Sequence, residues 1–149
     1  MFEYIHRIIL EFDGASRNNP YGPAGCGFVV YEMDWDGSKG NLIHEENEYL
    51  GYNVSNNQAE YKGLINGLVL IYNYYNFRGL YIRGDSEIVI HQLNGNYAVG
   101  SPNISHLYEV AKQSIQNVDC MFVKIQHISR SLNYEADELA NQAIYDNEY

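Results

Sequence analysis

The sequence predicts an α/β protein built on a five-stranded mixed sheet, with the first three strands antiparallel and helices flanking the sheet. Short segments rich in β-branched and aromatic residues fill the first third of the chain. After residue 56, segments with helical periodicity alternate with further short apolar segments. The resulting order, βββαβααβα, is typical of a sheet with helices packed on its faces. The 149 residues suit one core, so we expect a single domain over residues 1–149.

The first part of the chain contains the three predicted antiparallel strands. Residues 4–12 (YIHRIILEF) predict the first strand, and the Asn-, Pro- and Gly-rich segment from Asp13 to Gly25 predicts a long turn after it. Residues 25–33 predict the second strand and residues 41–52 the third. An Asp-Gly pair between these two strands favours a hairpin.

A long helix is predicted over residues 57–76. Small residues recur on one stripe of this helix, and we expect that stripe to pack closely on the sheet. Ser55 or Asn56 is expected to cap the start of the helix, with Gln58 supporting that start. The remaining predicted elements are a strand at 79–84, a helix at 86–93, a helix from Pro102 to residue 116, a strand at 119–128 and a helix at 134–145.

The composition excludes several classes of protein. Hydrophobic residues make up 46% of the chain, which is too many for a disordered protein. No apolar run approaches the roughly 20 residues needed to span a bilayer, and charged residues interrupt the apolar N-terminus, so no signal peptide is predicted. Cys26 and Cys120 fit no ligand spacing, which favours two reduced thiols. We therefore expect an intracellular monomer, cytoplasmic or nucleoid-associated, that contacts no membrane.

Four carboxylates fall at strand ends and in first helical turns. Asp13 and Asp85 are predicted at the ends of the first and fourth strands, and Glu60 and Asp137 in the first turns of two helices. Each has an ordinary explanation: Asp13 as a turn residue, Asp85 as a helix cap, and the other two as partners of a helix macrodipole. Together they predict a convergence of carboxylate oxygens, which are the ligands that hard divalent cations prefer.

Four segments carry a resemblance to a known family. They are FDGASRNNPYGPAG, SNNQAEYKGL, RGDSEIVIHQLNGNY and HISRSLNYEADELAN, in this order between residues 6 and 146. In these segments the chain resembles the type 1 ribonucleases H, in a short form without a basic protrusion after the third helix. The resemblance implies a ribonuclease H-like fold. It also implies an endonuclease that hydrolyses the RNA strand of an RNA–DNA hybrid and leaves 5′-phosphate and 3′-hydroxyl ends.

The resemblance also implies roles for individual residues. Asp13, Glu60, Asp85 and Asp137 would bind two Mg²⁺ ions, with Mn²⁺ as a substitute, and His127 would assist proton transfer or product release. Several side chains are expected to contact the hybrid, chiefly at the 2′-hydroxyls and base edges of its minor groove. They are Ser16, Arg17, Asn18, Asn19, Asn56, Asn57 and Glu87. Glu87 departs from the family pattern, which often has Gln there, and a carboxylate repels phosphates.

The net charge of −10 is unusual for a nucleic-acid enzyme, because Lys and Arg usually contact the phosphates. The nine basic residues form no run, and Arg17, Lys62 and Arg130 are expected to make a local positive rim near the acidic residues. We therefore expect weak binding without metal and a shallow salt dependence. Two alternatives stay open. One is another nuclease or strand-transfer enzyme of the same fold, and the other is a non-catalytic module that binds hybrids.

Overall fold

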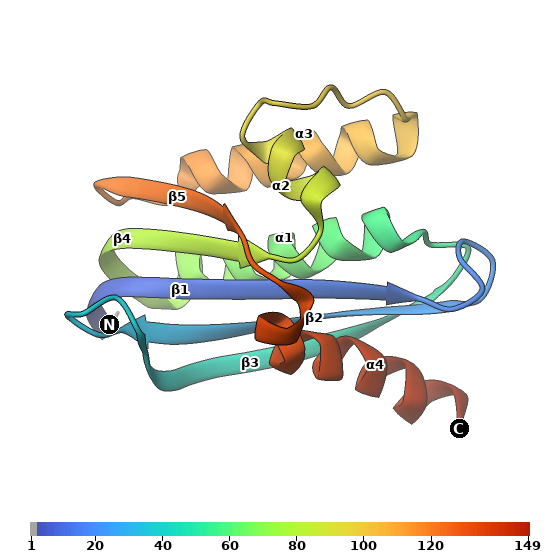
Figure 1. Cartoon of the computed structure of the whole chain (residues 1–149), viewed down its shortest axis with the longest axis horizontal. Helices are drawn as coiled ribbons and strands as arrows, with labels where there is room; N and C mark the ends of the chain where they lie inside the picture. The colour runs from blue at the N-terminus through green and yellow to red at the C-terminus, as the bar shows by residue number, and fades with distance from the viewer. Residues whose placement is uncertain (1–2) are drawn as a thin grey trace.

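The computed structural model describes residues 3–149, and its five strands form one mixed sheet with helices on both faces (Figure 1). In chain order the elements are β1 (Glu3–Ser16), β2 (Pro23–Met33), β3 (Lys39–Tyr52), α1 (Asn56–Tyr74), β4 (Tyr75–Gly84), α2 (Glu87–Leu93), α3 (Pro102–Asn117), β5 (Phe122–His127), the 3₁₀ helix η1 (Arg130–Asn133) and α4 (Tyr134–Glu148). The strand order is β3-β2-β1-β4-β5. The β1–β2 and β2–β3 pairs are antiparallel, and the β1–β4 and β4–β5 pairs are parallel. The predicted fold is confirmed.

Several element boundaries differ from the sequence-based prediction, and those of β1 and β4 differ for a clear physical reason. β1 does not end before Asp13 but continues to Ser16, because this segment pairs with the first residues of β2 in antiparallel register. The turn that follows is therefore shorter than predicted, and Asp13 lies inside a strand. β4 begins at Tyr75, directly after α1, because it pairs with β1 from its first residue. The helical turn η1 was not predicted.

The start of α1 follows the prediction closely. The Ser55 hydroxyl accepts a hydrogen bond from the Gln58 backbone nitrogen at 3.1 Å, and the Gln58 side chain accepts one from the Ser55 backbone nitrogen at 2.8 Å. This reciprocal capping box satisfies amides that a helix start leaves unpaired. Ser86, rather than Asp85, caps α2, so the interpretation of Asp85 as a helix cap is wrong.

Helices cover the two faces of the sheet unequally (Figure 1). The main hydrophobic core lies between the sheet and the helices α1, α2 and α3, and its largest buried side chains include Tyr61, Phe12 and Phe28. On the other face α4 packs on β1, β2 and β3, over a smaller cluster that contains Ile9 and Val29. Between residues 3 and 149 no helix combines the length and the apolar character that crossing a membrane would need.

Candidate active site

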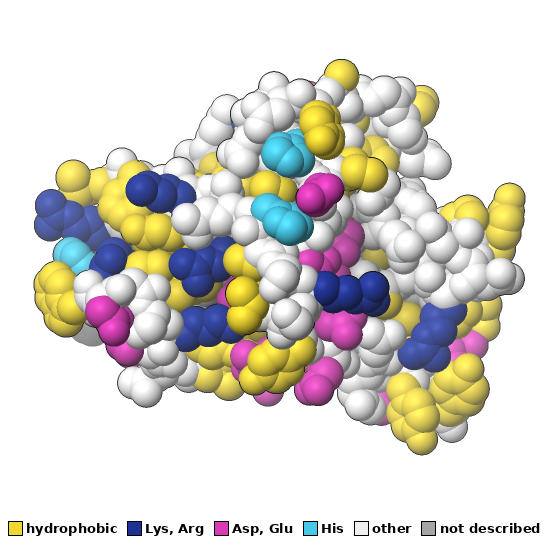
Figure 2. Space-filling view, in the orientation of Figure 1, with side chains coloured by type: hydrophobic (Ala, Val, Ile, Leu, Met, Phe, Trp, Pro, Cys, Tyr) yellow, Lys and Arg dark blue, Asp and Glu magenta, His cyan; other side chains and the backbone are white. Residues whose placement is uncertain are grey.

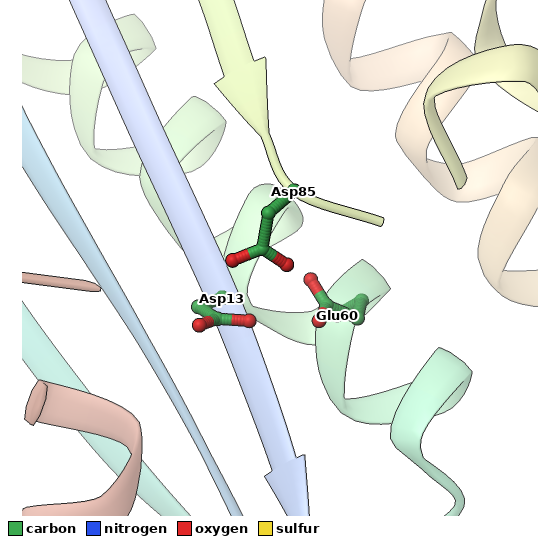
Figure 3. Close-up of side chains that lie close together, drawn as sticks. All are labelled: Asp13, Glu60 and Asp85. Atoms are coloured by element: carbon green, nitrogen blue, oxygen red, sulfur yellow. The ribbon is translucent and has the colours of Figure 1, made fainter. Parts of the chain in front are cut away.

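Three carboxylates from separate elements meet at one end of the sheet (Figure 3). Asp13 belongs to β1, Asp85 directly follows β4, and Glu60 lies in the first turns of α1. β1 and β4 are parallel neighbours with Glu11 opposite Arg83, so Asp13 and Asp85 reach the same level of the sheet. One oxygen from each of the three carboxylates lies within 4.8 Å of the others. The close-up shows the three side chains pointing toward one another.

Two glycines allow α1 to bring Glu60 this close to β1. A Cβ at Gly14 would lie 2.3 Å from the Glu60 backbone nitrogen, and a Cβ at Gly63 would lie 2.8 Å from the Asp13 carbonyl oxygen. Either methyl group would push the helix away from the strand, since real Cβ contacts are longer. Glycine at both positions therefore fixes the distance between the helix and strand that carry Glu60 and Asp13.

The environment of Asp13 and Glu60 disfavours their charged forms. Asp13 is 4% exposed and Glu60 is 6% exposed. Burial raises the pKa of Asp13 to about 7; the hydrogen bond with Glu60 opposes this shift and the charge of Asp85 adds to it. Burial, followed by the charge of Asp13, raises the pKa of Glu60 well above its usual value. Its Oε2 atom is buried and has no hydrogen-bond partner among the described residues. A cation bound between Asp13 and Glu60 would therefore favour their ionised forms.

Asp137 enters the same site from α4. It lines, together with the three clustered carboxylates, a cavity of about 430 Å³. The charge of Asp137 contributes to the raised pKa of Asp13, although it is not one of the three carboxylates that lie within 4.8 Å. The other residues that line the cavity are Gly14, Ala15, Ser16, Arg17, Asn56, Asn57, Ser86, Arg130 and Asn141. The site is therefore an open, polar hollow with a buried acidic floor.

Comparison with known proteins gives a consistent result. Residues 11–143 match the family described as reverse transcriptase-like. Ribonuclease HI from Halobacterium salinarum is 36% identical over 140 residues, which cover 94% of this chain and 65% of that protein. The crystal structure of RNase H1 from the same archaeon has a TM-score of 0.81 at 36% identity, with 94% of this chain and 98% of the other covered. This chain belongs to the type 1 ribonuclease H family.

A further member of the type 1 ribonuclease H family has been seen with nucleic acid. LC11-RNase H1, whose structure was solved in complex with an RNA/DNA hybrid, is 33% identical with a TM-score of 0.79, covering 93% of this chain and 97% of that one. Among full-length relatives, the chain spans 65% of the Halobacterium protein and 35% of the bifunctional protein Rv2228c of Mycobacterium tuberculosis, which is 34% identical.

The residues expected to read the hybrid in this ribonuclease H chain lie around the cavity mouth. Asn56 accepts a hydrogen bond from the Ser16 backbone nitrogen at 2.9 Å, and Asn19 accepts one from the Asn56 backbone nitrogen at 3.1 Å. These bonds tie the loop after β1 to the start of α1. They use the amide oxygens, so each amide NH₂ group is left as a donor. Arg17 and Asn57 line the cavity, and Asn18 is exposed in the loop with φ of +52°.

Three other candidate residues lie outside the cavity lining. His127, at the end of β5, is exposed and its Nε2 lies 3.2 Å from the Asp85 carbonyl oxygen. Glu87 is exposed in the first turn of α2. Lys62 does not join the rim, because it lies 4.0 Å from Glu48 of β3 instead. Of the three cations expected there, Arg17 and Arg130 line the cavity.

Two asparagines that the sequence analysis did not single out hold the carboxylates of the site. Asn133 is fully buried, and its side-chain nitrogen lies 3.1 Å from Asp85 Oδ2. Asn141 donates to Asp137 Oδ1 at 3.2 Å and accepts from Arg17 at 3.3 Å. Asn133 precedes Asp137 by four residues, and Asn141 follows it by four residues. That spacing places Asn141 on the same helix face as Asp137, which is the signal that the sequence offered.

Proposed function

We propose that this chain is an endoribonuclease that hydrolyses the RNA strand of RNA–DNA hybrids with divalent metal ions, leaving 5′-phosphate and 3′-hydroxyl ends. The observation that carries the proposal is the cluster of Asp13, Glu60 and Asp85 oxygens within 4.8 Å at the floor of a polar cavity. The name of the Halobacterium relative and the hybrid bound to LC11-RNase H1 support this substrate. We further propose that residues 1–149 act as one monomeric catalytic domain in the cytoplasm or at the nucleoid.

The site fits divalent metal ions. All its candidate ligands are carboxylate oxygens, which suit Mg²⁺ and Mn²⁺ rather than soft metals. Glu60 Oε2 is buried without a hydrogen-bond partner among the described residues. Burial and the neighbouring carboxylates raise the pKa of Asp13 and of Glu60, and a bound cation would offset both effects. We infer two Mg²⁺ ions held by Asp13, Glu60, Asp85 and Asp137, with Mn²⁺ as a substitute. Two such ions would supply an activated water and stabilise the charge on the leaving oxygen of a phosphodiester.

The side chains of the chain itself orient the site and the substrate. Asn133 and Asn141 fix the direction of Asp85 and Asp137 through their amide groups. The free amide donors of Asn19 and Asn56 point to recognition of 2′-hydroxyls and base edges, which distinguish RNA from DNA in the minor groove of a hybrid. Further contacts would come from Ser16, Arg17, Asn18 and Asn57. Glu87 would approach the hybrid from α2.

His127 fits a role in moving a proton or releasing the product. It is exposed next to the cavity, and its bond to the Asp85 carbonyl oxygen holds the ring beside the acidic cluster. A His that assists proton transfer typically contributes about 10²–10⁴-fold to a rate. We therefore expect His127→Ala to lower kcat strongly while the affinity for hybrid changes little.

The proposal is tested by cleavage of one labelled RNA strand in three forms: paired with DNA, paired with RNA and single-stranded. A labelled DNA duplex is tested in parallel. We expect cleavage of the hybrid alone, in Mg²⁺ and in Mn²⁺ and not in EDTA. Asp85→Asn should abolish it, whereas the control Asp119→Asn, an exposed carboxylate just before β5, should cleave at the parent rate. Hybrid cleavage by Asp85→Asn at the parent rate, or cleavage of the DNA duplex without cleavage of the hybrid, would overturn the proposal.

A further inference from the structure

The face of the sheet that carries α4 is only partly covered (Figure 1). α4 packs on β1, β2 and β3, and beyond it the alternation of the strands places three cationic and two aromatic side chains on the open part of this face, with Gln126 beside Arg83. Tyr81 belongs to this side because it packs against the cluster under α4. The five side chains, which form the open-face patch, are Arg7, Tyr81, Arg83, Phe122 and Lys124.

The open-face patch concentrates positive charge on an acidic protein. The chain has nine basic residues and a net charge of −10, yet three of the nine lie in this patch. Figure 2 shows dark blue side chains gathering over β1, β4 and β5 on the face in view. Among the side chains of residues 5–149, the ion pairs of Lys and Arg within 4.0 Å involve Lys39 and Lys62. Arg7 donates to the Asp34 carbonyl oxygen at 2.7 Å and Arg83 to Gln126 Oε1 at 3.0 Å, and both acceptors are neutral. Arg7, Arg83 and Lys124 therefore have no carboxylate partner within 4.0 Å, among the described side chains, to offset their charge.

Aromatic rings lie between these cations. Phe122 is 37% exposed, and its ring rests on Gly79, where an added Cβ would lie 2.2 Å from the ring. Tyr81 meets the Phe122 ring edge-to-face at 5.7 Å, and the Arg83 guanidinium lies 5.8 Å from the Tyr81 ring centre. The patch therefore offers a supported, partly exposed ring among cations that have no carboxylate partner in the described part of the chain.

The cations follow the register of the strands in regular steps. The register pairs Arg83 with Gln126, Lys124 with Tyr81, and Arg7 with Gly79. Lys124 therefore lies two residues before the level of Arg83 along the strands, and Arg7 lies two residues before the level of Lys124. Two residues of strand span roughly 6.6 Å. The row begins two residues before Asp85 and leads away from the acidic cavity, whose lining includes none of the five side chains.

We propose that the open-face patch binds a single strand of nucleic acid, with phosphates on Arg7, Arg83 and Lys124 and bases stacked on Phe122 and Tyr81. Proteins that bind single strands without sequence preference combine two features. Cations lie along the phosphate backbone, and aromatic rings beside them stack on the bases. An acidic peptide would also pair with the cations, but its carboxylates do not account for the aromatic rings between them, on which nucleobases stack. The surface is separate from the carboxylate cavity and is independent of the bound metal.

The test measures binding of a fluorescein-labelled 20-nucleotide oligo(U) RNA by anisotropy, in EDTA and over a series of salt concentrations. Lys124→Gln is the informative variant because no hydrogen bond or ion pair of its side chain is observed within residues 5–149, so its loss leaves the fold intact. Lys112→Gln, which removes a cation from α3 behind the sheet, is the matched control.

We expect Lys124→Gln to weaken binding about 3- to 10-fold and to make the salt slope shallower by about 0.7, the value for one phosphate contact on a single strand. Adding Arg7→Gln should double the change in slope, and Phe122→Ala should weaken binding at unchanged slope.

Three results would overturn the proposal: no measurable binding of oligo(U) by the parent, equal losses in Lys124→Gln and Lys112→Gln, or displacement of the RNA by oligo-glutamate as effectively as by unlabelled RNA. The last result would assign the patch to an acidic peptide. Cleavage of a blunt-ended hybrid is measured in parallel and should be unchanged in Lys124→Gln. A chain that binds oligo(U) through Lys124 without cleaving hybrid would contradict the proposed nuclease function and leave the open-face patch standing.

Discussion

Asn133 connects Asp85 to β1. Its side-chain nitrogen lies 3.1 Å from Asp85 Oδ2 and 2.9 Å from the carbonyl oxygen of Phe12, the residue before Asp13. One amide group therefore positions the Asp85 carboxylate relative to the strand that carries Asp13. Asn133 is fully buried, so this relationship is shielded from exchange with water.

We expect Asn133→Ala to lower both stability and metal affinity. The Phe12 carbonyl would lose its buried donor, which costs about 1–3 kcal/mol of unfolding free energy. Asp85 would lose the group that orients it, and loss of such a partner typically lowers metal affinity about 10- to 100-fold. Urea denaturation and calorimetric Mg²⁺ titration measure the two effects. The control is Asn103→Ala, an exposed amide at the start of α3. Parent-like Mg²⁺ affinity in a folded Asn133→Ala protein would show that Asp85 does not need this bond.

The stability of the metal-free protein should depend on pH through Asp13. Burial raises the pKa of its carboxyl to about 7 in the folded state, so folding favours the protonated form. The stability linked to this proton is complete below the usual pKa near 3.8 and is lost as the pH rises through about 7. In EDTA at pH 8, Asp13→Asn should therefore melt above the parent, by roughly 5 °C or more. The difference should shrink toward pH 5 and also on adding Mg²⁺ to the parent.

Thermal melts at pH 5, 6, 7 and 8, with and without Mg²⁺, provide this measurement. Asp119→Asn serves as the matched control because its carboxylate is exposed, and its difference from the parent should not vary across the same range. If Asp13→Asn were less stable than the metal-free parent at pH 8, burial of the ionised Asp13 carboxylate would not destabilise the folded protein.

The sequence predicted the elements well and their ends less well. Hydrophobic periodicity is local, so each strand and helix could be recognised from its own residues. The end of β1 depends on pairing with β2, where Asp13 faces Gly27 and Ser16 faces Ala24, and this non-local pairing overrides the turn character of Asp13-Gly14. Tertiary pairing of this kind cannot be read from one segment.

The same distinction applies to the functional residues. The clustered carboxylates could be proposed because each lies in a recognisable motif. Asn133 could not, because its contact with Asp85 spans 48 residues and depends on how η1 packs against β1. The open-face patch could not be predicted from the sequence either, because it also depends on non-local contacts. Arg7, Arg83 and Lys124 form no run in the sequence, and only the register of β1, β4 and β5 aligns them.

Gly63→Ala should separate the two buried carboxylates. The new Cβ would lie 2.8 Å from the Asp13 carbonyl oxygen and 3.1 Å from that of Gly27, and both are backbone atoms that cannot rotate away. α1 would have to move outward with Glu60, at a cost of about 1–3 kcal/mol in unfolding free energy. We expect weaker Mg²⁺ binding and slower hybrid cleavage. Gly100→Ala, where an added Cβ meets nothing within 4 Å, should leave both unchanged. Equal behaviour of the two variants would mean that the helix–strand distance is not critical.

Lys39→Met should destabilise the protein through Glu11. Glu11 is 1% exposed, and Lys39 Nζ lies 2.9 Å from its Oε1. Burial raises the pKa of Glu11, and the bond to Lys39 offsets only part of that shift. Without Lys39 the buried carboxylate has lost its partner, which typically costs about 3–5 kcal/mol. The pKa of Glu11 would rise further, so the loss should be larger at pH 8 than at pH 5, because lower pH favours the protonated form of Glu11.

The double variant Lys39→Met/Glu11→Gln separates this effect from lost packing. Lys39 also lies 4.9 Å from the Tyr31 ring centre and 3.7 Å from Glu135, and these contacts are lost in both variants. If the buried charge is the cause, the double variant should recover most of the unfolding free energy at pH 8, because a neutral amide tolerates burial better than a carboxylate. Urea denaturation at both pH values gives the comparison. A double variant no more stable than Lys39→Met would assign the loss to the Tyr31 and Glu135 contacts instead.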